Sequence, residues 1–265
     1  MRNNERYTLG YGAASIAMMA SRTAENHAEF FLTHLIPGMN VLDVGCGPGT
    51  ITLGFAEKIY PGTVTGIELD LVQTKSVSAN ASEELNLHFA TGDIYQLDFD
   101  DSIFDAIFAS ALIGNLKFPL KGIEELKRVL KPGGILGIKE FDHSANIAYP
   151  VPDFQEEIEN LYNRLRISNG HDPDSGRKVK SYLHEAGFEN INCTAVFHNV
   201  TIPEGKGSSL MEALVRDEWG PAFIRKGWVT SEQVEKWIKA SEIYERTGSS
   251  FIANAWIEAL CRKAD

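Results

Sequence analysis

Short apolar runs alternate with longer amphipathic stretches between Asn40 and about Glu140. The runs have the length and apolar character of buried parallel strands: Val41–Val44, Thr63–Glu68, Leu85–Ala90, Phe104–Ser110 and Ile135–Lys139. The stretches between them predict helices: Thr50–Ile59, Leu71–Glu84 and Ile123–Leu130, the last ending before the breaker cluster 131–134. Strands that alternate with helices predict right-handed crossovers and a doubly wound, Rossmann-like α/β sheet.

The segments that flank this region have a different pattern. Residues 7–36 look helical, and the spacing of apolar residues predicts helices over Asp153–Ser168, with Asp153 as N-cap, and Lys178–Ala186. Strands are expected over Ile191–Phe197 and Phe251–Cys261. Between those strands lies an insertion, about 198–250, in which Thr230 and Gln233 resemble a capping box. We interpret residues 1–265 as one domain, with an N-terminal helical segment (1–36), a cofactor-binding core (37–140) and a helical cap inserted before the last strand.

The first predicted strand runs directly into a glycine-rich turn. The segment VLDVGCGPGT, residues 41–50, places glycines at positions 45, 47 and 49, just before a predicted helix. Glycine allows the backbone to approach a ligand closely and to adopt angles that other side chains disfavour. The helix that follows offers free amide groups to that ligand. The turn therefore predicts a cofactor site.

Acidic residues occur near the ends of successive predicted strands. Asp43 lies just before the turn, Glu68 ends the second strand and Asp93 follows the third. Ligands of open parallel sheets bind beyond the carboxyl ends of the strands. Each acid alone has an ordinary explanation, as a solvated acid or a turn cap, but the three together indicate a nucleoside. Glu68 suits two ribose hydroxyls, and Asp93 suits an adenine amino group with Ile94 against the base.

The glycine spacing argues against a nicotinamide dehydrogenase. The dinucleotide pattern Gly-x-Gly-x-x-Gly would require a third glycine where this chain has Thr50 or Thr52. A phosphate-binding Gly-Lys-Ser/Thr sequence does not follow the turn either. Neither the dinucleotide pattern nor a Walker-type phosphate loop is therefore present at this turn.

Five segments, in this order and spacing, resemble those of class I S-adenosylmethionine-dependent methyltransferases: VLDVGCGPGT, GIELD, GDIYQLDF, FDAIFAS and RVLKPGG. The similarity is greatest to the small-molecule branch that includes ubiquinone and menaquinone methyltransferases, and it covers about residues 37–140. It implies a seven-stranded methyltransferase fold, S-adenosylmethionine as cofactor and S-adenosylhomocysteine as product.

The resemblance also implies a set of cofactor contacts. Gly45, Cys46 and Gly47 would contact the methionine and ribose parts, and Glu68 the ribose hydroxyls. The remaining contacts would come from Leu69 beside the adenine, Asp93 and Ile94 on the adenine, Ser110 near the methionine, and Gln73 near the ribose. Asp43 is expected to lie beside the cofactor, and Arg22 or Tyr11 is a further candidate for the methionine carboxylate.

The net charge and the cysteines indicate which partners and cellular location to expect. The chain carries 36 acidic and 25 basic residues, a net charge of -11, which disfavours nucleic acid. Its three cysteines are far apart and show no metal-ligand spacing, so we expect a reduced, cytoplasmic protein without a metal. The apolar stretch Ala13–Ala20 is too short to span a membrane.

We therefore predict methyl transfer to a small, apolar or aromatic metabolite. Aromatic residues of the insertion and its border either wall the acceptor pocket or form the core of the cap: Phe197, Trp219, Phe223, Trp228 and Trp237. His143 is the best candidate for a base, and His171 reads as a loop residue. Two alternatives stay open: a non-methylating reaction such as cyclisation, and a non-catalytic S-adenosylmethionine-binding protein. The pattern leaves the acceptor, the methylated atom and the oligomeric state undefined.

Overall fold

A computed structural model describes residues 8, 10–74, 84–200, 210–246 and 250–265. The side chains of residues 73, 210, 245 and 246 are also outside this description. Among the described residues, no helix combines the length and the apolar character needed to cross a membrane.

An eight-stranded mixed sheet forms the centre of the molecule, with the strand order β3-β2-β1-β4-β5-β8-β6 and with β7 paired to β8. Five strands are parallel: β1 (Asn40–Val44), β2 (Thr63–Glu68), β3 (Asn86–Thr91), β4 (Phe104–Ser110) and β5 (Leu130–Phe141). The last strand, β8 (Phe251–Arg262), runs antiparallel to β5, to β6 (Ile147–Tyr149) and to β7 (Glu189–Asn199). The doubly wound α/β class is thus confirmed, and the short β6 adds one strand to the seven expected.

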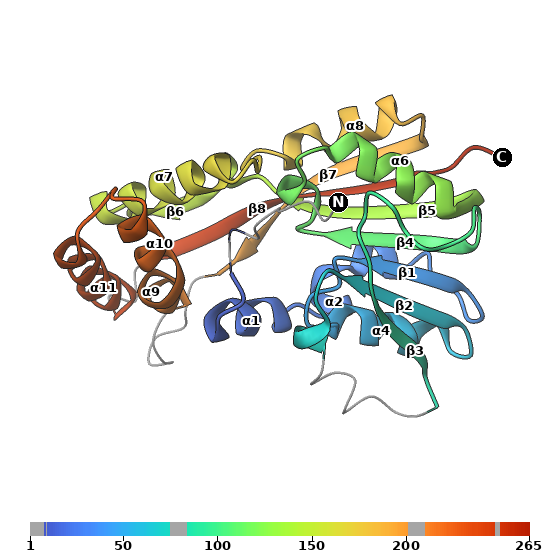
Figure 1. Ribbon diagram of the computed structural model, residues 1–265, viewed down its shortest axis with the longest axis horizontal. Coiled ribbons are helices and arrows are strands. Elements are labelled where there is room, and N and C mark those ends of the chain that lie inside the picture. Colours follow the sequence, from blue (N-terminus) through green and yellow to red (C-terminus); the bar gives the residue numbers. More distant parts are fainter. Residues whose placement is uncertain (1–7, 9, 75–83, 201–209, 247–249) are drawn as a thin grey trace.

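The helices fall into three groups (Figure 1). Those near the N-terminus are α1 (Ala13–Ala20), α2 (Ala24–His27), α3 (Glu29–Leu32) and α4 (Thr50–Ile59). The helices α6 (Pro119–Val129) and α8 (Val179–Glu185) pack together on the opposite face of the sheet. The third group consists of α7 (Asp153–Ser168), α9 (Leu210–Leu214), a π-helical turn (Val215–Trp219), α10 (Gly220–Arg225) and α11 (Ser231–Arg246).

Aromatic rings fill the layer between the sheet and the N-terminal helices. Phe31 of α3 is fully buried, and its ring centroid lies 5.4 Å from that of Phe55 and 5.2 Å from that of Phe108. Gly137 of β5 leaves room for this packing, since a Cβ atom there would lie 2.5 Å from the Phe31 ring. These contacts fix α2, α3 and α4 on one face of the sheet.

The third group of helices forms a cap with its own apolar core. Trp219, Phe223 and Trp237 are almost fully buried in it, and Trp219 stacks on Tyr162 of α7 with 4.3 Å between ring centroids. Trp228 is partly buried against the same cluster. Of the two uses expected for these side chains, the structure therefore places them in the core of the cap. Phe197, on β7, is half-exposed instead.

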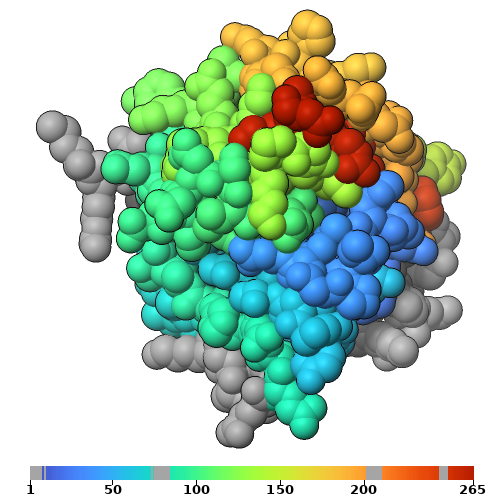
Figure 2. Space-filling view, turned by 90° about the vertical axis from the view of Figure 1, so that its right-hand side faces the viewer, coloured from blue at the N-terminus to red at the C-terminus, as the bar shows by residue number. Residues whose placement is uncertain are grey.

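Figure 1 shows where the cap lies: beyond the carboxyl ends of the parallel strands, with α1 between it and the sheet. Figure 2 shows the opposite end of the molecule, where the C-terminal residues (red) pack against the start of β5. There the Gly133 N–H donates to the Lys263 carbonyl at 2.9 Å, and the Lys263 N–H donates to the Gly134 carbonyl at 3.1 Å.

This pairing explains why residues 131–134 are not a break. The expected breaker cluster is part of β5, which begins directly after α6. Gly133 adopts a φ of +68°, and the pairing of β4 with β5 shifts register at this point. The strand absorbs the glycines as an irregularity of the sheet instead of ending there.

Three smaller expectations need correction. The N-cap of α7 is Pro152, and Asp153 is its first helical residue. The Thr230 hydroxyl does accept the Gln233 N–H at 3.2 Å, but the Gln233 side chain donates to Glu157 at 3.4 Å instead of completing a capping box. The expected helix Leu71–Glu84 begins as a 3₁₀ turn over Leu71–Thr74, and its next nine residues lie outside the described part of the chain.

We predict that Phe31→Ala lowers the free energy of unfolding by about 3–5 kcal/mol, because it leaves a cavity beside the rings of Phe55 and Phe108 and the sheet. Denaturant titration measures this loss. Phe118→Ala is the control, since Phe118 is 50% exposed and a surface substitution is expected to cost roughly 0.5 kcal/mol or less. Equal losses in the two variants would contradict the packing described for α3.

Candidate functional site

The turn between β1 and α4 exposes its backbone. Gly45, Gly47 and Gly49 have φ values of +71°, +54° and +87°, in the left-handed region that only glycine adopts without strain. The Ile67 carbonyl holds the turn to β2 by accepting the N–H groups of residues 45 and 46 at 2.8 and 3.1 Å. A Cβ atom on Gly47 would meet nothing nearer than the Met19 sulfur, 3.8 Å away. Space for a ligand thus lies directly over this residue.

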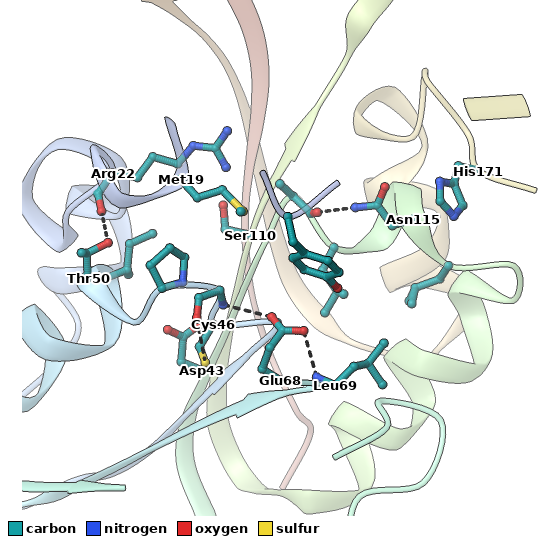
Figure 3. A pocket seen from close by; sticks show the side chains of 18 residues that line it. Met19, Arg22, Asp43, Cys46, Thr50, Glu68, Leu69, Ser110, Asn115 and His171 are labelled. Atoms are coloured by element: carbon teal, nitrogen blue, oxygen red, sulfur yellow. Dashed lines mark hydrogen bonds between the residues drawn. The ribbon is translucent and has the colours of Figure 1, made fainter. Parts of the chain in front are cut away.

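Glu68 lies beside the turn, at the carboxyl end of β2. Its carboxylate accepts the Gly47 N–H at 3.0 Å and the Leu69 N–H at 2.8 Å (Figure 3). Burial raises the pKa of this carboxyl, and the two backbone hydrogen bonds oppose the rise. Each oxygen retains a further acceptor site, so the group can accept two additional hydroxyls.

Two other side chains support the turn from below. Asp43 is 2% exposed and accepts the Thr52 hydroxyl at 2.6 Å. Burial raises the pKa of Asp43 to about 7. Cys46 is also buried, and this burial raises the pKa of its thiol, which keeps it protonated. Cys46 fills space as expected and does not have the character of a nucleophile.

The side chain of Arg22, which follows α1, lines one side of the pocket. The Arg22 guanidinium lies 5.0 Å from the centroid of the Trp256 ring and 5.4 Å from that of Phe141. The Thr50 hydroxyl donates to the Arg22 carbonyl at 2.7 Å, which ties the end of α1 to the start of α4. Tyr11 also lines the pocket, and burial with the nearby Glu68 raises the pKa of its phenol.

Ser110 ends β4 at the rear of the same pocket. Its hydroxyl lies 2.9 Å from Nε2 of His27, a side chain that is 2% exposed. Burial lowers the pKa of His27 to about 2, so its ring is neutral at physiological pH. The pair is therefore an uncharged hydrogen bond that orients the Ser110 hydroxyl.

The structure brings most of the predicted cofactor residues to one pocket. Its lining includes seven of them: Asp43, Gly45, Cys46, Gly47, Glu68, Leu69 and Ser110. It also includes both side chains considered for the methionine carboxylate, Tyr11 and Arg22.

Three expected cofactor residues are not in this lining. The Asp93 carboxylate accepts the Tyr95 N–H at 3.0 Å and so caps a turn, while Ile94 is 6% exposed and packs into the core with Ile67. The side chain of Gln73 lies outside the described part of the chain. The described part of the structure therefore does not bring these three side chains to the pocket, and their contacts with the adenine stay predictions.

The candidate base is also elsewhere. His143 does not line the pocket: its ring stacks on Phe141, with 5.0 Å between centroids, and faces Tyr162 of the cap. Burial lowers the pKa of His143 to about 3. The residue lies after β5 as expected, but its side chain turns into the boundary between sheet and cap.

Several residues that line the pocket were not predicted from the sequence. His171 is in the lining although it reads as an ordinary loop residue, and so are Met19, Leu112, Asn115 and Leu116. They come from α1, from the loop after β4 and from the segment after α7. These residues are far apart in the sequence, so the sequence alone does not show that they line one pocket. They come together because α1 and the α7–α8 connection cross the end of the sheet.

The comparison with known families agrees with this arrangement. A profile described as a methyltransferase domain matches residues 35–187, more than half of the chain. The chain belongs to the methyltransferase-domain family. The resemblance to S-adenosylmethionine-dependent methyltransferases expected from the motifs is thereby confirmed.

The relatives of this methyltransferase align with different fractions of the chain. An uncharacterized methyltransferase of Schizosaccharomyces pombe is 34% identical over 71% of each chain. A demethylmenaquinone methyltransferase of Symbiobacterium thermophilum is 33% identical. The matched region covers 49% of this chain and 54% of that relative. The crystal structure of the YcgJ protein of Bacillus subtilis has a TM-score of 0.58 at 17% identity, over 89% of this chain and 98% of that protein, a likeness of fold.

The pocket fits the methyl donor of this family. S-adenosylmethionine has ribose hydroxyls, an amino-acid carboxylate and a sulfonium cation, but no phosphate. The lining offers an acid at a strand end, an arginine and a glycine turn with space above it. Among the described residues, no group of three or more His, Cys, Asp or Glu side chains is arranged to hold a metal.

The raised pKa of Asp43 predicts a pH dependence of stability. A carboxyl whose pKa is about 7 when folded, instead of its ordinary 3.8, binds more protons in the folded state between these values. The free energy of unfolding therefore falls as pH rises from about 4 to 7 through this group. Denaturant titrations should show that Asp43→Asn flattens this fall. Parallel profiles for the two proteins would show that Asp43 is ionised throughout.

Proposed function

We propose that this protein transfers the methyl group of S-adenosylmethionine to a small neutral metabolite at the pocket between the glycine turn and α1. The observation that carries the proposal is the contact of Glu68 with Gly47, which places a carboxylate beside a glycine with space above it. An acid beside a backbone turn suits the hydroxyls of a ribose. The glycine spacing of the turn, which lacks Gly-x-Gly-x-x-Gly, favours a nucleoside sulfonium over a dinucleotide.

Each side chain then has a defined task in holding the donor. Glu68 accepts the two ribose hydroxyls, and the backbone at Gly45–Gly47 receives the methionine part. Arg22, held over the rings of Trp256 and Phe141, attracts the methionine carboxylate. Leu69, 61% exposed beside the carboxylate, offers an apolar surface to the adenine. The roles of Asp93, Ile94 and Gln73 at the adenine stay predictions from the family resemblance.

The donor supplies an electrophilic methyl group, whose transfer neutralises the positive charge on sulfur. The protein's task is to align the acceptor with that methyl group and to exclude water. Met19, Leu112 and Leu116 provide an apolar wall for an acceptor. Among the residues that line the pocket, Arg22 is a permanent cation and cannot act as a base, so an acceptor that loses its proton easily suits this site best.

A nucleic acid partner stays disfavoured by the net charge of -11, and a cytoplasmic location stays a prediction from the cysteines. A non-methylating reaction such as cyclisation would use the same donor contacts. Measurement of S-adenosylhomocysteine release with a panel of metabolites separates the two reactions, because only methyl transfer releases it.

The donor site is tested by calorimetric titration with S-adenosylhomocysteine. We expect Glu68→Ala to weaken binding by about 1.5–3 kcal/mol, the value of hydrogen bonds to a charged group. The matched control is Glu124→Ala, an exposed acid of α6 that should leave the affinity unchanged. NAD serves as the competing ligand. Unchanged affinity in Glu68→Ala, or binding of NAD in preference, would refute the ribose assignment.

A further inference from the structure

One part of the pocket wall contains polar atoms that the donor site does not use. His171 is 5% exposed, and within the described part of the chain its Nε2 has no hydrogen-bond partner. The same holds for Oδ1 of Asn115. Both residues line the pocket. A buried polar atom without a partner costs free energy, so a ligand that pairs with it gains affinity.

The two residues are held next to each other by their backbones. The Asp172 N–H, one residue after His171, donates to the Gly114 carbonyl, one residue before Asn115, at 2.9 Å. The Arg166 side chain donates to the same carbonyl at 3.2 Å. In Figure 3 the pair lies on the side of the pocket away from Arg22 and Thr50.

The hydrogen bonds around His171 define which of its nitrogens carries the proton. Its Nδ1 lies 2.6 Å from the Thr8 hydroxyl oxygen, which also accepts the Asn169 side-chain amide at 3.0 Å. Among the described residues, the Thr8 hydroxyl has no other hydrogen-bond partner than these two, so Nδ1 is the one acceptor for its proton and we assign the proton there. Burial and the charge of Arg166 lower the pKa of His171 to about 4, so the ring is neutral near pH 7. A neutral ring that accepts at Nδ1 has its proton on Nε2.

Asn115 has the complementary character. Its side-chain amide donates to the Ala111 carbonyl at 2.7 Å, which leaves Oδ1 as an acceptor. The pair thus presents one donor, Nε2–H, and one acceptor, Oδ1, next to the apolar side chains of Leu112 and Leu116. A hydroxyl group satisfies both, because its oxygen accepts and its proton is donated. A carboxylate has no proton for Oδ1, and an ammonium has no lone pair for Nε2–H.

We infer that His171 and Asn115 recognise a hydroxyl group on an otherwise apolar methyl acceptor. The inference rests on the proposed methyl transfer and names the class of acceptor: a phenol that binds in its neutral form. Nε2 of His171 donates to the hydroxyl oxygen, and Oδ1 of Asn115 accepts the hydroxyl proton. His171 and Asn115 then determine specificity and orient the acceptor, and no covalent bond to them forms.

The test compares two probes of similar shape, 2-naphthol and naphthalene, by fluorescence titration of the protein saturated with S-adenosylhomocysteine. The wild type should bind 2-naphthol about tenfold more tightly than naphthalene, the preference given by roughly 1.4 kcal/mol of hydrogen bonding. His171→Phe should remove the preference, and Asn115→Leu should reduce it. His171→Gln retains an amide donor and should restore part of it.

The matched control is His184→Phe, an exposed histidine of α8 whose replacement should leave the preference intact. Nitrogen NMR of the wild-type histidine rings provides a measurement that needs no variant, and it should show the His171 proton on Nε2. A wild type that binds the probes equally or binds neither, a preference that survives in His171→Phe, or a proton on Nδ1 would overturn the inference.

Binding of S-adenosylhomocysteine is measured separately in every variant. It should stay within about twofold of the wild type, since His171 and Asn115 lie away from Glu68. If the wild type does not bind S-adenosylhomocysteine at all, the proposed function fails. If it binds S-adenosylhomocysteine but shows no preference for 2-naphthol, only the inference about the acceptor fails.

Discussion

The whole site depends on one backbone constraint: three alternate residues between β1 and α4 have left-handed φ angles. Side chains at these positions would strain the turn, and one at Gly49 would also meet the Phe89 ring at 2.6 Å. With glycine there, the chain reverses tightly and leaves space over Gly47. The Ile67 carbonyl fixes the turn against β2, so Glu68 at the end of that strand is always beside it.

The remainder of the pocket is built on that turn by elements from both ends of the chain. The N-terminal helices are anchored to the sheet by the rings of Phe31, Phe55 and Phe108, and this places Arg22 beside the start of α4. The α7–α8 connection brings His171 to the opposite wall through its backbone contact with the loop after β4. The donor and acceptor regions are therefore positioned by separate contacts and can be tested separately.

The sequence was sufficient for the features that follow from local chemistry. Alternating apolar runs and helical stretches predicted the sheet, and Thr50–Ile59 has the predicted bounds because Gly49 starts the helix directly. Strand ends predicted the positions of Glu68 and Ser110. Features set by distant contacts were not accessible. Residues 131–134 look like a break, yet they are paired in β5 because the C-terminal segment bonds to them.

The same reason explains the differences at the site. Asp93 follows β3 as predicted, and its carboxylate accepts the Tyr95 N–H, a contact that spacing does not reveal. Its role at the adenine stays a prediction. His143 was favoured as a base from its place after β5, and packing against Phe141 and Tyr162 turns it away. No sequence pattern pointed to His171. Its importance comes from the folded structure, in which its buried Nε2 has no hydrogen-bond partner among the described residues.

The most direct measurement is a crystal structure of the protein grown with S-adenosylhomocysteine. We predict electron density along the glycine turn, with both ribose hydroxyls on the Glu68 carboxylate and the amino-acid carboxylate on the Arg22 side. Density for the ligand away from residues 45–49, or a ribose that does not contact Glu68, would contradict this prediction.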